Sequence, residues 1–114
     1  MKIKTDFVTN SSSTAYLITN FSKESKTLVD FVKENPDLIE QFRKQYGYEK
    51  HEGYTQAKLI ESAESNNIKF KADATKYCIF GDEQETLIGH VFDYILRDGG
   101  ASNNFLWQFE EYLR

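Results

Sequence analysis

The chain contains few of the residues that build metal centres, disulfides or thiol active sites, with one cysteine and two histidines in 114 residues. The single cysteine, Cys78, cannot form an internal disulfide, which is typical of a reducing compartment. No histidine or cysteine lies at metal-ligand spacing, so a zinc site is not expected. A Walker loop, a dinucleotide-type glycine fingerprint and a Gly-x-Ser-x-Gly elbow are also missing. We therefore expect no metal and no cofactor.

Long apolar runs are absent as well. No stretch approaches the roughly 18 to 20 apolar residues that a membrane span requires, and the N-terminus lacks the charged-then-apolar pattern of a signal peptide. These absences predict a cytoplasmic protein that does not enter a membrane.

The chain has no excess of positive charge. Its 14 Lys and Arg residues stand against 18 Asp and Glu residues, which gives a formal net charge of -4. General nucleic-acid binders need a basic surface to attract phosphates, so sequence-independent binding of DNA or RNA is disfavoured. The acids are interrupted by lysines, which argues against a mimic of nucleic acid.

Bulky apolar side chains, by contrast, are abundant. Hydrophobic residues make up 39% of the chain and aromatic residues 15%, including nine Phe, seven Tyr and one Trp. This is ample material for a core, and the length is close to the commonest size of a single domain. We expect residues 1–114 to form one domain.

Periodicity and turn residues predict the elements of the first half. The first twenty residues predict a β-hairpin with strands near 2–8 and 14–19 and the serines at its tip. Helices are predicted at 26–34, from Asn35-Pro36-Asp37 to Gly47, and from the N-cap candidate Thr55 to residues 65–67.

The second half predicts strands at 68–70 and 76–80, followed by a helix that opens at Asp82 with a capping box to Glu85. The segment 105–113 fits both a strand and a helical face, and its alternating aromatic residues favour the strand. The predicted fold class is α+β: an N-terminal β-hairpin, three helices, then β-α-β, in a small, mainly antiparallel sheet with helices packed on one face.

Most candidates for chemistry are better explained by the core. Cys78 lies inside an apolar strand, where loss of water raises the pKa of a thiol and makes it a poor nucleophile. Glu110 and Glu111 are adjacent, so their carboxylates diverge. The aromatic residues Phe105, Trp107 and Phe109 could stack on bases, but without a basic surround they are expected in the core.

One helical face carries an acid, a base and a cation. Its members are Thr86, His90, Asp93 and Arg97. The helical wheel places this face away from the apolar stripe of the same helix, which argues against a Cys78–His90 dyad. We expect a solvated face with an i,i+4 pair between Asp93 and Arg97, while a binding role for His90 and Arg97 stays open.

The polar run Thr9, Asn10, Ser11, Ser12 and Ser13 is the most informative local feature. Turns favour these residues, so a hairpin turn held by side-chain to backbone bonds is one interpretation. A hydroxyl-rich turn with free N–H groups can also hold a phosphate or carboxylate, or be docked by another protein. Both interpretations stay open.

The segment Asp6-Phe7-Val8-Thr9-Asn10-Ser11-Ser12-Ser13 resembles the N-terminal signature of a scattered set of small bacterial and phage proteins. Those proteins begin with Met-Lys-Ile and commonly continue with more serines and Phe, whereas this chain continues with Thr14-Ala15-Tyr16. The resemblance covers about the first 13 residues. It implies no established activity and no catalytic residue.

Two functional hypotheses follow. The first is a non-enzymatic protein-binding module, associated with a phage or mobile element, that docks on a host or bacterial protein through Asn10–Ser13 and the exposed face of a helix at 83–97. The alternative is a small enzyme or sensor that binds a phosphorylated metabolite or nucleotide at Thr9–Ser13, with His90 and Arg97 contributing.

Overall fold

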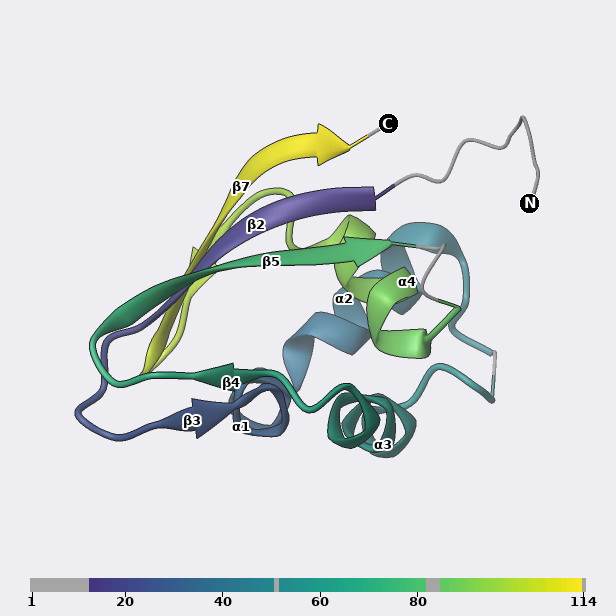
Figure 1. Ribbon diagram of the computed structural model, residues 1–114. Helices are drawn as coiled ribbons and strands as arrows, with labels where there is room; N and C mark the ends of the chain where they lie inside the picture. Colours follow the sequence, from purple (N-terminus) through teal and green to yellow (C-terminus); the bar gives the residue numbers. More distant parts are fainter. Residues whose placement is uncertain (1–12, 51, 82–84, 114) are drawn as a thin grey trace.

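The computed structural model describes residues 13–50, 52–81 and 85–113, and it has the expected α+β architecture. Figure 1 shows the helices on one side of an antiparallel sheet. The helices are α1 (Leu28–Glu34), α2 (Asp37–Tyr46), α3 (Gln56–Asn66) and α4 (Leu87–Ile95). The strands are β2 (Ser13–Asn20), β3 (Lys26–Thr27), β4 (Lys69–Phe70), β5 (Ala74–Gly81), β6 (Gly100–Ala101) and β7 (Phe105–Leu113).

Strand β2 lies in the middle of the main sheet, whose order is β5-β2-β7-β6. It pairs antiparallel with β5 on one edge and with β7 on the other, from Ser13 to Asn20. The strand predicted at 14–19 is therefore confirmed, and the segment 2–8 lies outside the described residues. Because both edges of β2 are taken by distant segments, the predicted pairing with a local hairpin partner is corrected.

Local signals fix most ends of the first three helices, although α1 begins at Leu28, two residues later than predicted. The side chain of Thr27 accepts a hydrogen bond from the backbone of Asp30, which closes a capping box, and Thr55 caps α3. Gly47 ends α2 in the left-handed conformation, with φ of 75°, which glycine adopts without the steric cost of a Cβ atom.

The start of α2 differs from the prediction in one detail. Pro36 is the N-cap and offers no side-chain cap. Asn35 instead donates its side-chain amide to the carbonyl of Phe31 at 2.9 Å and to the hydroxyl of Ser102 at 3.2 Å. Asn35 therefore closes α1 and joins it to the loop before β7.

Helix α4 begins later than the capping-box pattern indicated. Its N-cap is Thr86, whose hydroxyl accepts from the backbone of Gly89 at 3.0 Å. Glu85, the expected partner in the capping box, has a positive φ of 53° and lies outside the helix. The predicted span of 83–97 is therefore corrected to Leu87–Ile95.

The core is built around the ring of Phe31 in α1. This ring meets Phe92, Phe105 and Trp107 edge to face, at centroid distances of 5.6, 5.1 and 5.2 Å. The contacts join α1 to α4 and to β7, which confirms both the final strand and the buried positions of Phe105 and Trp107. Phe109 is 38% exposed, so its expected place in the core is wrong.

Within the described part of the chain, no helix is both long enough and apolar enough to cross a membrane.

The packing of Trp107 against Gly100 gives a first prediction. A Cβ atom on Gly100 would lie 2.5 Å from Cζ2 of the buried indole, so Gly100→Ala should displace the ring. We expect the free energy of unfolding, measured by urea denaturation, to fall by about 1–3 kcal/mol. The control Ala101→Ser, at the exposed neighbouring position, should change it by less than about 0.5 kcal/mol. Equal stability of both variants would contradict this packing.

Candidate functional site

The structure describes only one residue of the predicted polar site at the N-terminus. Thr9, Asn10, Ser11 and Ser12 lie outside the described residues. Ser13 is the first residue of β2, is only 2% exposed, and pairs with Gly81 on one side and Leu113 on the other. Ser13 therefore starts the central strand, and it is not exposed at the tip of a turn.

The residue after Ser13 meets the polar face of α4. The hydroxyl of Thr14 donates to Oδ1 of Asp93 at 2.5 Å, and the hydroxyl of Tyr16 donates to the backbone carbonyl of Asp93 at 2.7 Å. Asp93 is fully buried. The expectation of a solvated Asp93 is therefore wrong, because this side of α4 packs against β2.

Arg97 completes the cluster. Its Nε donates to the backbone carbonyl of Asp93 at 2.8 Å, and its Nη2 lies 3.3 Å from Oδ1. The expected i,i+4 pair is thus present, but it is largely buried. The guanidinium also packs over the rings of Tyr94 and Tyr112, at 4.7 and 5.1 Å from their centroids. Cation–π contacts of this kind add to the ion pair.

The protonation states of the cluster follow from its surroundings. Burial raises the pKa of the Tyr16 hydroxyl, more than the nearby charge of Arg97 lowers it. Partial burial opposes the charge of Arg97, but its hydrogen bond to Asp93 and the charge of that carboxylate raise its pKa overall. Both groups therefore stay protonated as donors to Asp93, and the cluster is built to hold α4 on the sheet.

His90 belongs to an aromatic cluster. Its imidazole lies against the rings of Phe42, Tyr54 and Tyr94, with centroid distances of 5.5, 6.0 and 5.6 Å. The imidazole is half-buried and packs among residues of α4, of α2 and of the segment that precedes α3. The expectation that His90 lies on a solvated face is therefore wrong. The ring of Tyr94 contacts both the imidazole of His90 and the guanidinium of Arg97.

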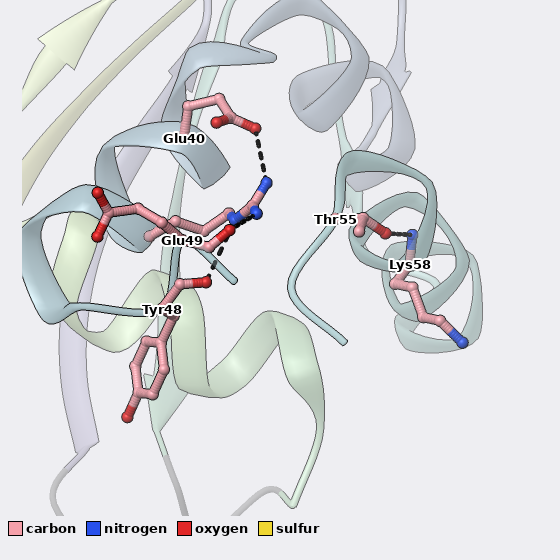
Figure 2. Close-up of polar contacts among 6 residues, drawn as sticks. Glu40, Tyr48, Glu49, Thr55 and Lys58 are labelled. Carbon is pink, nitrogen blue, oxygen red and sulfur yellow. Dashed lines mark hydrogen bonds and ion pairs between the residues drawn. The ribbon is translucent and has the colours of Figure 1, made fainter. Parts of the chain in front are cut away.

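The segment after α2 that carries part of this aromatic cluster is held by Arg43. The guanidinium donates to the backbone carbonyls of Tyr48, at 3.4 Å, and of Glu49, and it pairs with Glu40 at 3.3 Å. Figure 2 shows these contacts beside the Thr55 cap, which lies 3.2 Å from the backbone nitrogen of Lys58. The loop that leads from α2 to α3 is thus fixed at both ends by polar contacts.

Cys78 is a core residue, as predicted. It is 3% exposed, and burial raises the pKa of its thiol to about 12, more than the charge of Lys76 lowers it. Among the described residues, no group of histidine, cysteine, aspartate and glutamate is placed to hold a metal ion.

The sheet face opposite the helices is open and partly apolar. Its register places Leu17 beside Tyr77, Ala15 beside Ile79, and Thr19 beside both Thr75 and Leu106. Tyr77, Ile79 and Leu106 are 46%, 38% and 43% exposed, and Leu17 is half-buried. We call Leu17, Tyr77, Ile79 and Leu106 the open-face residues.

Sequence reasoning missed this surface. The segment 76–80 is predicted only as an apolar strand, with Cys78 in the core, although Tyr77 and Ile79 alternate with Cys78 and Phe80. That period of two is the signal that could have found the face, because successive side chains of a strand point to opposite sides.

The edges of the sheet are also accessible. β5 is an outermost strand. β6 pairs only with Leu106 and Trp107, so in the described chain residues 108–113 of β7 have β2 as their one neighbour. The exposed Glu110 and Glu111 in this stretch are the kind of charged residues that discourage edge-to-edge aggregation.

Comparisons with known proteins found no matching family model, no similar curated protein and no similar solved structure.

The Asp93 cluster gives a stability prediction. Asp93→Ala removes the acceptor for Thr14 and Arg97 and leaves a buried gap, so we expect the free energy of unfolding to fall by about 3 kcal/mol. Asp98→Ala, which removes an exposed acid just after the same helix, should cost less than about 0.5 kcal/mol. Urea denaturation measures both, and equal effects would show that Asp93 does not hold α4.

Cys78 gives a third prediction, on reactivity. With a pKa of about 12 in the folded protein, only about one thiol in ten thousand is ionised at pH 8, and the thiolate is the reactive form. We expect a thiol reagent such as Ellman's reagent to label the native protein slowly and the urea-unfolded protein rapidly. Rapid labelling of the native protein would place the thiol outside the core.

Proposed function

We propose that the protein is a non-enzymatic binding module that docks on a protein partner through the open face of its sheet. The observation that carries this proposal is the group of open-face residues, which come from three adjacent strands and alternate with buried residues of the core. Figure 1 shows these strands with the helices on one side of the sheet. Contiguous apolar patches on small proteins are typical of interaction sites.

The composition of the face suits recognition of a protein. Aromatic and aliphatic side chains form the centre of most interfaces, and polar groups form the rim. Here the apolar residues are bordered by Gln108 and by Glu111, which accepts a hydrogen bond from Tyr77 at 2.9 Å. Since the face is built on paired strands, its side chains are positioned before binding, which reduces the entropy lost on association.

The resemblance of residues 6–13 to small bacterial and phage proteins supports a setting for this activity. We propose a cytoplasmic protein associated with a phage or mobile element, whose partner is a host or bacterial protein. Thr9, Asn10, Ser11 and Ser12 stay candidates for a second contact region, because they lead directly into β2.

The alternative site, in which Thr9–Ser13, His90 and Arg97 bind a phosphorylated ligand, has less support. Ser13 is buried in the sheet, and two donors of Arg97 are already directed at Asp93. Arg97 would have to leave its carboxylate partner to bind an anion, so we favour docking as the function.

The test compares two sets of exposed residues. Ile79→Ser combined with Leu106→Ser removes the apolar centre of the face, while Tyr46→Ser removes an aromatic side chain of similar exposure, 42%, from α2. Partners are captured from a bacterial lysate, identified by mass spectrometry, purified, and titrated by calorimetry. We expect the double variant to bind about tenfold or more weakly and the control to change affinity by less than about twofold.

A further arm replaces Ser11, Ser12 and Ser13 with alanine. A loss of binding there, with full binding by the double variant, would move the contact region to the N-terminal segment and contradict docking through the open face. Unfolding curves for every variant separate lost contacts from lost folding.

A further inference from the structure

We propose that a lysine-lined cavity beside β3, β4 and the start of β5 binds a small phosphorylated ligand with an apolar or aromatic body, of the nucleotide class. The cavity has a volume of about 640 Å³, which is in the range of small-molecule sites. Its wall is formed by residues 25–27, 69–71 and 74–76. This inference is independent of docking through the open face.

The charge of the cavity is opposite to that of the chain. Four of its nine lining residues are lysines, and none is acidic: Lys26, Lys69, Lys71 and Lys76. In the described structure none of these four ammonium groups forms an ion pair. A chain with net charge -4 therefore concentrates positive charge at one hollow, which is the arrangement that attracts phosphate groups.

Glu24 and Asp73 directly precede the lining residues Ser25 and Ala74 in the chain. Two further acids, both in α1, are engaged in hydrogen bonds. The carboxylate of Asp30 accepts from the backbone and the hydroxyl of Thr27, at 2.8 and 3.2 Å. Glu34 accepts from Ser102 and from both nitrogens of Asn104. Burial opposes ionisation of Glu34, but these hydrogen bonds, helped by the nearby charge of Lys26, lower the pKa of its carboxyl overall.

The apolar part of the wall favours phosphorylated ligands that carry an apolar or aromatic body over inorganic phosphate. Most of the accessible surface of the cavity is apolar. The ring of Phe70 lies beneath this surface, only 1% exposed, and packs on Phe105 with centroids 5.5 Å apart. Inorganic phosphate would use only the lysines. A ligand that joins phosphates to an apolar or aromatic body would also cover this apolar surface and gain from its burial.

The backbone of the wall is held in place before any ligand binds. The side-chain amide of the fully buried Asn20 donates to the carbonyls of Phe70 and Lys71, both at 3.3 Å. Asp73 turns the chain with a positive φ of 51°, and its backbone N–H bonds the carbonyl of Ser22 at 3.1 Å. In Figure 1 this is the bend that joins β4 to β5. A preformed wall needs little reorganisation to bind.

The test is a titration of the full chain at low salt, followed by amide NMR and calorimetry, with four probes: ATP, tripolyphosphate, inorganic phosphate and a short oligo-dT. We expect ATP to shift the amides of 25–27, 69–71 and 74–76 and to bind more tightly than tripolyphosphate or phosphate. Lys69→Glu with Lys76→Glu should weaken ATP about tenfold or more. The control, Lys44→Glu with Lys58→Glu, makes the same change in net charge on exposed helical positions and should weaken ATP less than about twofold.

Four results would overturn the proposal. ATP could leave the amides of the cavity wall unshifted, or the control could lose as much affinity as the cavity variant, which would indicate a diffuse charge effect. Phosphate could bind as tightly as ATP, which would remove the apolar wall from recognition. Oligo-dT could bind these lysines about tenfold more tightly than ATP, which would make the site one for a polymer.

Discussion

The buried carboxylate of Asp93 is the contact on which the arrangement of this molecule depends. A fully buried acid is costly unless it is paired and hydrogen-bonded, and Asp93 receives Thr14 from the central strand and Arg97 from its own helix. Tyr16 adds a bond to the backbone carbonyl of the same residue. These bonds fix α4 against β2, and the aromatic core around Phe31 then joins α1 to both.

Because the helices pack on one side of the sheet, they do not cover the side chains on its other side. The strands β5, β2 and β7 bury one set of alternating side chains and leave the open-face residues uncovered in the described structure. The same topology bends the chain from β4 into β5, where Asn20 holds the wall of the lysine-lined cavity. Thr14 and Asn20 lie near opposite ends of β2. Thr14 bonds Asp93 and so holds α4 on the covered side of the sheet, and Asn20 holds the wall of the cavity.

Sequence reasoning was most successful where local chemistry decides the structure. Thr27, Thr55 and Gly47 mark helix ends by their own hydrogen bonds and conformations. It was wrong where tertiary packing decides. The helical wheel shows which residues share a face with Asp93, but only the position of β2 shows that this face is buried. Three of the cavity lysines lie close together at 69–76, but Lys26 comes from a distant segment and the cavity forms only when the two segments meet. The two neighbours of β2 are likewise non-local.

The central claim is that the open face is the working surface of the protein. It is tested most directly by methyl NMR of the protein bound to its purified partner. Ile79 and Leu106 point away from the helices, while Ile18 and Ile88 are fully buried, so the two groups report on different sides of the sheet. The account predicts that the partner shifts or broadens the methyl signals of Ile79 and Leu106 and leaves those of Ile18 and Ile88 nearly unchanged. Unperturbed signals from Ile79 and Leu106 in the saturated complex would contradict it.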